Sequence, residues 1–222
     1  MILTNRLFER VAPSREAKSI FIFCEGAKRE FDYFEYFKEL DSRINIEVYK
    51  LHPHENNSPL GLLNIAEKCM IKSDDNPNPK YSFIDGDEVW IVLDTDKDKE
   101  LSRESQIEVI QKKCGELTNW NLAQSNPCFE VWLYYHLHTD KPNFAKSEIC
   151  AEWKQLVNGL IKGGFDSRRH PIYIMSASKN AAQNFIVIEG KLDVGSTEVF
   201  NLANSIIPLV SSKLEKVLKE IE

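Results

Sequence analysis

The hydrophobic pattern of the chain alternates short apolar runs with amphipathic stretches. Runs rich in β-branched and aromatic residues predict strands at 19–24, 44–51, 89–93 and 120–123. Apolar residues at helical spacing predict helices at 28–40, 59–70, 103–117 and 128–138. Strands that alternate with helices are typical of an α/β protein with a mostly parallel sheet. The run 89–93 is apolar without alternation, which indicates a strand buried on both faces.

The two ends of the chain differ from this α/β pattern. Residues 1–18 are polar and mixed, which predicts a tail or an arm over the surface. After Pro142 the pattern is helical, with predicted helices at 146–162, 179–189 and 196–221. We therefore expect an N-terminal tail (1–18), an α/β core (19–142) and a helical C-terminal part (143–222) packed on the core.

Composition places the chain among soluble globular proteins. Its 222 residues are 42% hydrophobic and 28% charged, and no apolar run approaches the ~20 residues that cross a bilayer, so no membrane is expected. The five cysteines are scattered, odd in number and free of any Cys-x-x-Cys pair. This argues against disulfides and a zinc site, and predicts a cytoplasmic location.

The formal net charge of −6 lowers the expectation of nucleic-acid binding by charge alone. A polyphosphate substrate would then depend on a bound divalent metal for part of its attraction.

Candidate chemistry gathers where predicted strands end. Asp94, Asp96 and Asp98 follow the strand 89–93, at the edge of a parallel sheet where ligands bind. While the chain stays extended, Asp94 and Asp96 point the same way and could share one cation. Glu25 follows the first strand at the corresponding place, and Glu130 lies in the first turn of a predicted helix. Together these carboxylates predict a site for Mg²⁺ or Mn²⁺, although Glu25 and Glu130 also suit helix entry.

The Asp-x-Asp motif alone is compatible with several functional interpretations. A solvated turn explains it, and so do a haloacid-dehalogenase-type phosphatase and a nucleotide-sugar transferase. The phosphatase motif usually lies near the start of a chain and has Thr or Val at the position of Asp98. An EF-hand loop fails because Lys99 occupies the position that needs glycine and Ser105 replaces the closing glutamate.

Four segments, taken in order, resemble the RloB family of the Toprim-like superfamily. They are Ile-Phe-Cys-Glu-Gly (22–26), Phe-Asp-Tyr-Phe (31–34), Val-Leu-Asp-Thr-Asp-Lys-Asp (92–98) and Ser-Asn-Pro-Cys-Phe-Glu-Val-Trp-Leu (125–133). The resemblance implies a Toprim-like, mostly parallel sheet flanked by helices, with a helical C-terminal extension. It also implies a metal-dependent nuclease that acts with an ABC- or SMC-type ATPase in bacterial anti-phage defence.

The same resemblance implies residue roles. Glu25 matches the glutamate that acts as general acid/base, Asp94 and Asp96 match the metal-holding aspartates, and Asp98 matches a more variable third acid. Lys28 fits the basic position after Glu-Gly, although Arg29 stands where small or polar residues are usual. On the residues' own chemistry, Glu130 would be a fourth carboxylate closing the metal site.

Exposed basic residues are candidates for contact with DNA or RNA. Arg168 and Arg169 follow a Gly-Gly pair and could form a basic lip, while Lys28 and Lys179 could offset phosphate charge. A solvated surface explains each of them equally well. Two further functions stay open: a catalytically inert interaction module that binds an ATPase or nucleic acid, and a small-molecule phosphatase with Asp94 as nucleophile. The apolar C-terminal helix either covers the sheet or forms a partner interface, which leaves room for a homo-oligomer.

Overall fold

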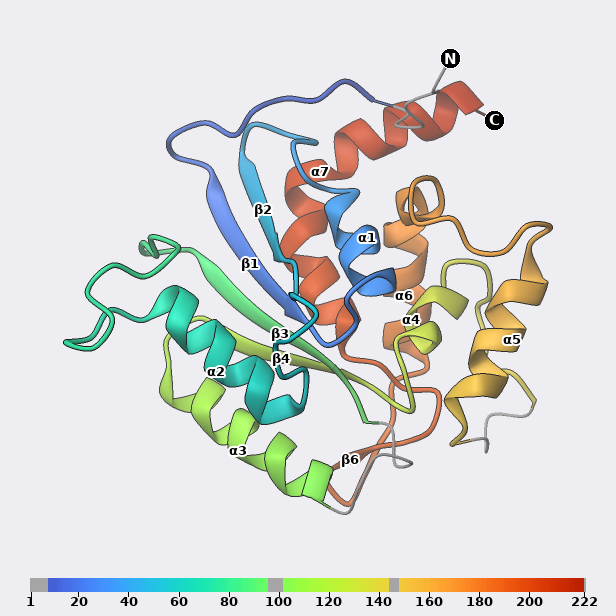
Figure 1. The fold of residues 1–222 in the computed structure, drawn as a ribbon. Coiled ribbons are helices and arrows are strands. Elements are labelled where there is room, and N and C mark those ends of the chain that lie inside the picture. The colour runs from blue at the N-terminus through green and yellow to red at the C-terminus, as the bar shows by residue number, and fades with distance from the viewer. Residues whose placement is uncertain (1–7, 96–101, 144–147, 222) are drawn as a thin grey trace.

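The computed structural model describes residues 8–95, 102–143 and 148–221. Its centre is a parallel sheet of four strands in the order β2-β1-β3-β4 (Figure 1). The strands span Lys18–Cys24 (β1), Ile44–Tyr49 (β2), Glu88–Asp94 (β3) and Trp120–Ser125 (β4). The predicted α/β fold with a mostly parallel sheet is confirmed, and it is consistent with a Toprim-like architecture.

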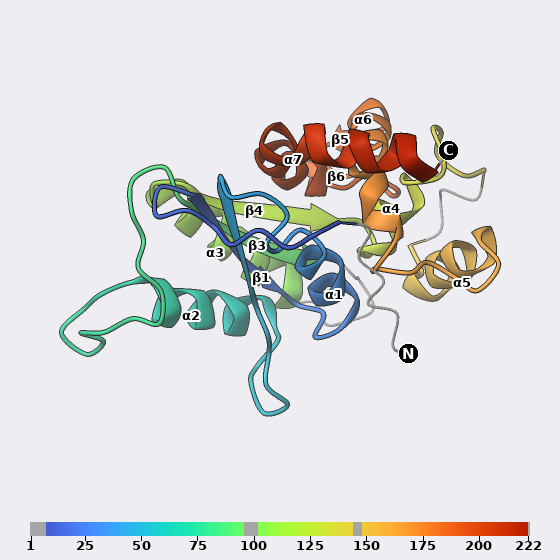
Figure 2. The ribbon, with the colours of Figure 1, turned by 90° about the horizontal axis from the view of Figure 1, so that it is seen from above.

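Helices cover both faces of the sheet. Their bounds are Arg29–Glu35 (α1), Pro59–Met70 (α2), Ser102–Glu116 (α3), Glu130–Tyr134 (α4), Cys150–Leu160 (α5), Ile174–Gln183 (α6) and Val199–Ile221 (α7). A 3-10 helix, His170–Tyr173, precedes α6. In Figure 2, α6 and α7 lie on one side of the sheet and α2 lies on the other.

Alternate residues of the strands pack into two separate hydrophobic cores, one on each face of the sheet. Ile20 and Ile22 of β1 point to the core shared with α1, α4, α5, α6 and α7, while Phe21 and Phe23 point to the core shared with α2 and α3. Successive side chains of a strand face opposite sides of a sheet. A strand that is apolar at every position must therefore be covered on both faces, as the pattern of 89–93 predicted.

The prediction of a helix over 179–189 is correct up to Gln183 and wrong beyond it. The helix α6 ends at Gln183, and the chain then forms a small antiparallel hairpin from Val187–Ile188 (β5) and Lys191–Leu192 (β6). Both turn residues, Glu189 (φ 50°) and Gly190 (φ 79°), have positive φ, which is the backbone of a tight hairpin turn. The β-branched run before Glu-Gly was the sequence signal for this hairpin.

Several element boundaries also differ from prediction. The helices α1, α4 and α5 are shorter than the predicted 28–40, 128–138 and 146–162. After α1 the chain continues in turns, and Glu39 reaches a positive φ of 58°, which ends helical geometry. Strand β4 is longer than predicted and reaches Ser125, which brings its carboxyl end to the candidate site.

Within the described ranges, no helix has both the length and the apolar character that crossing a membrane would require.

Candidate functional site

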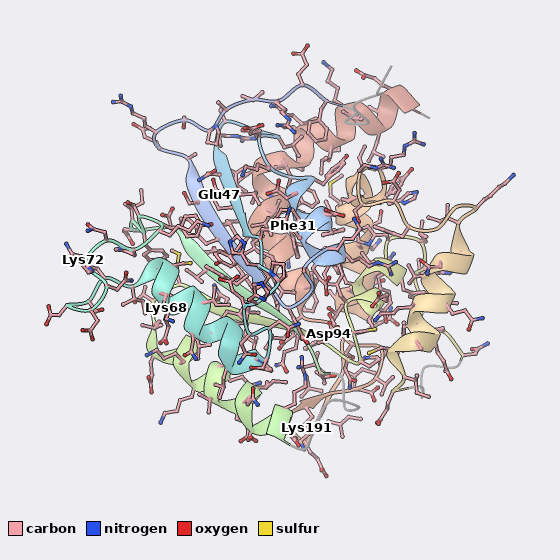
Figure 3. All side chains as sticks on the ribbon, viewed as in Figure 1. Phe31, Glu47, Lys68, Lys72, Asp94 and Lys191 are labelled. Carbon is pink, nitrogen blue, oxygen red and sulfur yellow. The ribbon has the colours of Figure 1, made fainter. Side chains whose placement is uncertain are left out.

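The sheet has a topological switch point between β1 and β3. The chain passes from β1 to β2 on one side, while β3 pairs with the other edge of β1. Open α/β sheets bind ligands beyond the carboxyl ends of the strands at such a point. Glu25 directly follows β1, and Asp94 ends β3 near the centre of the molecule (Figure 3). The fold thus places two predicted site residues where a ligand is expected.

Backbone geometry fixes Glu25 against Asp94. The Glu25 N–H donates to the Val92 carbonyl (3.1 Å), which extends the β1–β3 ladder by one residue. The Asp94 N–H in turn donates to Glu25 Oε2 (3.3 Å). The Asp94 carboxylate has a different partner, because its Oδ1 accepts the Phe129 N–H (2.8 Å) at the start of α4. One aspartate therefore joins the ends of β1 and β3 to the segment that carries Glu130.

Four carboxylates form what we call the acid cluster: Glu25, Glu30, Asp94 and Glu130. Burial raises the pKa of Asp94 well above its usual range, and the charges of the other three raise it further. Burial also raises the pKa of Glu30 to about 7, with added upward contributions from Glu130 and Glu25. Like charges held close together out of water disfavour ionisation. The cluster therefore has a surplus of negative charge that a cation would relieve.

Sequence reasoning missed Glu30. A Cβ at Gly26 would lie 1.8 Å from Glu30 Oε2, so the Glu30 carboxylate occupies the space beside the glycine. Glu30 belongs to the first turn of α1, and its position four residues after Gly26 on a predicted helix was the only available signal. The Glu-Gly motif thus provides both a carboxylate and the room for a second one.

Two arginines contact the acid cluster, and neither was predicted to do so. Arg103 is buried, with its guanidinium against Glu25 Oε2 and its Nε donating to the Asp94 carbonyl (3.0 Å). Arg29 Nη1 lies 2.8 Å from Glu130 Oε1, and Arg29 Nη2 also donates to Asn158 Oδ1 of α5 (3.3 Å). Arg103 and Arg29 therefore act as internal counter-cations.

The predicted nucleic-acid contacts lie further out. Lys28 is exposed and pairs with Asp32 (3.2 Å), while Arg168 pairs with Asp166 (3.0 Å). The Asp32 charge also contributes to a raised pKa of Arg168, after the larger effect of Asp166, which places the loop 163–170 near α1. Arg169 and Lys179 are exposed. Lys28 and Arg168 thus lie on the α1 side of the site, and no contact joins either of them to the acid cluster within the described ranges.

The donor chemistry of the cluster fits Mg²⁺, which prefers carboxylate oxygens. However, among the described residues no three His, Cys, Asp or Glu side chains are arranged to hold a metal ion. Glu25 and Glu130 are directed to arginines instead. The predicted ligands Asp96 and Asp98 lie outside the described residues. A complete ligand set thus requires those aspartates, or a turn of Glu25 or Glu130 away from its arginine.

Asn126 joins three chain segments beside the acid cluster. Its Oδ1 accepts the Thr95 hydroxyl (3.0 Å) after β3, and its Nδ2 donates to the Leu192 carbonyl (2.6 Å) of β6. Its backbone exchanges hydrogen bonds with the Ser196 carbonyl (2.9 Å) and the Gly195 N–H (2.8 Å). The Asn126–Pro127 peptide bond is cis. The Ser-Asn-Pro motif is therefore a structural junction that sets the wall of the site.

We expect Asn126→Ala to lower the free energy of unfolding by about 1–2 kcal/mol, because the half-buried Leu192 carbonyl and Thr95 hydroxyl lose their partner. The matched control is Asn121→Ala on the preceding strand β4, where the side chain donates to the Asn119 carbonyl (3.1 Å) on the surface. Urea denaturation measures both changes. Equal losses in the two variants would show that Asn126 is not a junction.

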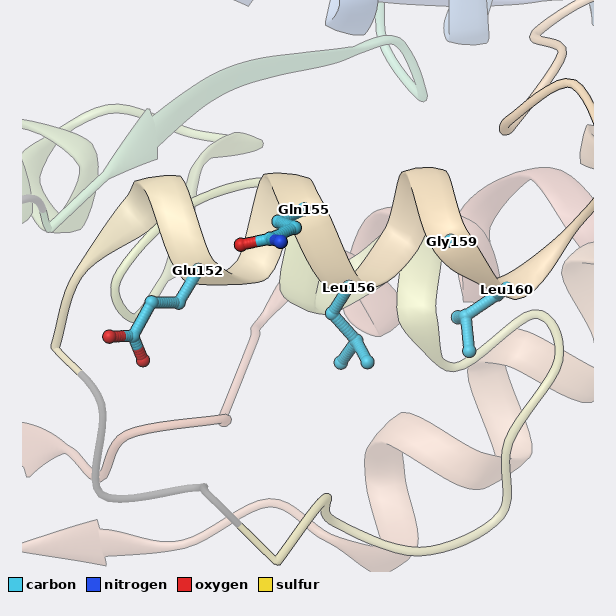
Figure 4. A pocket seen from close by; sticks show the side chains of 5 residues that line it. All are labelled: Glu152, Gln155, Leu156, Gly159 and Leu160. Carbon is cyan, nitrogen blue, oxygen red and sulfur yellow. The ribbon is translucent and has the colours of Figure 1, made fainter.

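The described surface includes the following two hollows. One of about 690 Å³ adjoins the acid cluster, between α3 and the β5–β6 hairpin, and includes Thr95, Arg103 and Asn126. The other, about 530 Å³, runs along α5 beside Glu152, Gln155, Leu156, Gly159 and Leu160 (Figure 4). Only Glu152 is titratable among the residues lining the second hollow. The first hollow is therefore the one that continues the site.

Comparison with known protein families gives a match over most of the chain. The family model described as RloB-like protein covers residues 20–206. No curated protein and no solved structure matches the chain. The matched range contains most of β1, all of β2 to β4, the acid cluster, both arginines and the Asn126 junction. Because the match covers well over half of the chain, the protein belongs to the RloB-like family.

Proposed function

We propose that this protein is a Mg²⁺- or Mn²⁺-dependent nuclease of the Toprim type. The observation that carries the proposal is the acid cluster at the switch point between β1 and β3, where burial and three neighbouring carboxylates raise the pKa of Asp94. Such a cluster suits a divalent cation and the phosphate oxygens that the cation attracts. The family match is compatible with this activity, and the nuclease assignment is our own.

We assign a role to each site residue from its position in the structure. Asp94, with Asp96 and Asp98 after it, would hold the ion, because Asp94 ends the strand at the centre of the cluster. When bound, the ion supplies Lewis acidity toward a phosphate oxygen and the attacking water. Glu25 or Glu130 would accept the proton of that water. Both glutamates are less than 9% exposed, so bulk water competes little for the proton transfer.

Basic groups on the rim would take the substrate's negative charge. Arg29 is partly exposed while it contacts Glu130, so its guanidinium is within reach of both the cluster and solvent. Lys28, Arg168, Arg169 and Lys179 are exposed and would contact the backbone of DNA or RNA. We further propose an ABC- or SMC-type ATPase as partner and anti-phage defence as the context, on the basis of the family resemblance.

A second candidate is a catalytically inert module that kept the fold. The observation that favours it is the pairing of Arg103 with Glu25, because a buried guanidinium already occupies the side of Glu25 that faces Asp94. In that case the arginines replace the cation permanently, and the protein would bind an ATPase or nucleic acid without cleaving it.

Calorimetric titration with Mn²⁺ and Mg²⁺ separates the two candidates. We expect a nuclease to bind one of these ions and Asp94→Asn to weaken the binding at least about tenfold, as loss of a metal-site group does. Asp75→Asn, in an exposed loop, is the matched control and should bind like the wild type. Absence of carboxylate-dependent binding would favour the inert module.

Cleavage assays then test the reaction itself. Single-stranded and duplex DNA, RNA and tRNA are incubated with Mg²⁺ or Mn²⁺, with and without the ATPase partner. We expect Asp94→Asn and Asp96→Ala to abolish cleavage, and unchanged cleavage by Asp96→Ala would refute the catalytic assignment. Hydrolysis of a generic phosphomonoester through a phosphoryl-Asp94 enzyme would instead indicate a phosphatase.

A further inference from the structure

The hollow between α3 and the β5–β6 hairpin continues directly from the acid cluster. We call it the α3–hairpin pocket; its volume is about 690 Å³. Thr95 and Asn126 line it at the carboxyl ends of β3 and β4, and Arg103 belongs to both the pocket and the cluster. A group held here would therefore be the immediate neighbour of whatever binds at Asp94.

The charge of this pocket disfavours a phosphate. Among the described residues that line it are three glutamates, Glu104, Glu108 and Glu189, and two cations, Arg103 and Lys191. Both cations are already engaged, because Arg103 pairs with Glu25 and Lys191 pairs with Glu104 across the pocket (Lys191 is labelled in Figure 3). Glu108 also lies close enough to contribute to a raised pKa of Lys191, after the larger effect of Glu104. The pocket thus offers hydrogen-bond acceptors in excess of donors.

The remaining lining suits a flat, partly apolar group with polar edges. Ile107 of α3 and Leu192 of the hairpin supply apolar surface, while Gln111 and Gln124 supply amides. The Gln124 Nε2 donates a hydrogen bond to Glu198 Oε2 (3.4 Å). The Gln124 Oε1 therefore remains an acceptor in the lining of the pocket. Gln111 is exposed and forms no hydrogen bond with another residue of the described ranges.

We propose that the α3–hairpin pocket receives the base of a nucleotide next to the scissile phosphate, with guanine preferred. The nucleic-acid identity of this ligand rests on the proposed nuclease function. Guanine presents its N1–H and 2-amino donors side by side, and a carboxylate accepts both at once. Glu108 is the acceptor, since Glu104 is paired with Lys191. The sugar and phosphate then lie toward Thr95 and the acid cluster, away from the three glutamates.

The test measures nucleotide binding to the full-length protein in EDTA, by calorimetry, so that neither metal nor cleavage enters. The probes are 5′-GMP, 5′-IMP, which lacks the 2-amino group, and 5′-UMP, which shares the phosphate but not the base. We expect GMP to bind about tenfold more tightly than IMP or UMP, the discrimination typical of a bidentate base contact. Glu108→Gln should remove this preference, while Glu116→Gln, exposed on the same helix, should keep it.

Each outcome decides the proposal. Equal binding of the three nucleotides, or a GMP preference that survives in Glu108→Gln, overturns the pocket assignment, as does failure of GMP to bind at millimolar concentration. GMP-selective binding by a protein that cleaves no nucleic acid would retain the pocket and refute the nuclease. Metal-dependent cleavage without any base preference in these titrations would refute the pocket alone.

Discussion

Replacing Arg103 with methionine is expected to lower the free energy of unfolding by about 3–5 kcal/mol in the absence of divalent metal. The Arg103 side chain is 7% exposed and that of its partner Glu25 is 8% exposed. Methionine preserves much of the apolar stem of arginine, so the loss of unfolding free energy comes from the missing charge and not from lost packing. Without the guanidinium, Glu25 loses its buried cationic partner, while the carboxylates of Asp94 and Glu30 remain close by. Urea denaturation in EDTA measures the change.

The matched control is Arg43→Met. Arg43 also joins a carboxylate to a carbonyl, since its Nε lies 2.9 Å from Asp41 Oδ1 and its Nη2 contacts the Leu209 carbonyl. Its side chain is 54% exposed, so solvent screens the pair and the variant should be far less destabilised. If Arg103→Met and Arg43→Met lost equal amounts of unfolding free energy, burial of the Arg103–Glu25 pair would contribute nothing to stability.

A double-mutant cycle ties this prediction to the proposed function. Because Glu25→Gln removes the charge that Arg103 compensates, Arg103→Met should cost much less in that background than in the wild type. Mg²⁺ should also stabilise Arg103→Met more than the wild type, since the Arg103 guanidinium no longer competes with the ion for Glu25. At about 100 times its Kd, a ligand that binds only the folded state adds about 2.7 kcal/mol. A variant that Mg²⁺ does not stabilise would favour the inert module.

The strands were predictable because their apolar runs leave few alternatives. A run such as 89–93 must be covered on both faces, and the two cores provide that cover. The last two residues of β4, Gln124 and Ser125, escaped prediction because they are polar and yet buried. Their partners come from distant residues: the Glu198 N–H donates to the Gln124 carbonyl (2.7 Å), and the Ser125 and Thr197 hydroxyls share a hydrogen bond (2.7 Å). Local sequence carries no sign of such pairing.

The acidic half of the candidate site was predictable, and the basic half was overlooked. Glu25, Asp94 and Glu130 follow from the rule that parallel strands end at one edge, and the structure brings them together with Glu30. Arg29 and Arg103 each lie in the first turn of a helix, where the helix dipole disfavours a positive charge. A cation in that place indicates a specific acidic partner. The sequence contained this signal, but only the fold shows which carboxylate each arginine meets.

The buried histidine His136 should make the protein sensitive to mild acid. Its Nε2 lies 2.9 Å from the Tyr33 hydroxyl and its Nδ1 lies 3.1 Å from the Trp132 carbonyl. Since a carbonyl only accepts, Nδ1 carries the proton and Nε2 accepts from Tyr33. Burial lowers the pKa of His136 from 6.5 to about 3. The folded state therefore keeps the ring neutral under conditions in which the unfolded chain protonates it.

The direction of the pH effect follows from this depressed pKa. The contribution of His136 to stability is fully present above the unfolded pKa of about 6.5 and is lost progressively as the pH falls toward the folded pKa of about 3. Between pH 7 and pH 4.5 the loss amounts to about 2.5 kcal/mol, at about 1.4 kcal/mol per pH unit in the steep part. The raised pKa values of Glu30 and Asp94 act in the opposite direction, because the folded state takes up their protons first as the pH falls. The His136 loss is therefore measured as the difference between two urea-denaturation profiles, those of the wild type and of His136→Gln, which retains a donor and an acceptor without titrating.

Relative to the wild type, His136→Gln should gain about 2.5 kcal/mol between pH 7 and pH 4.5, whereas His54→Gln on the surface should follow the wild type. Parallel profiles for the wild type and His136→Gln would mean that the buried ring takes up its proton as readily in the folded protein as in the unfolded chain.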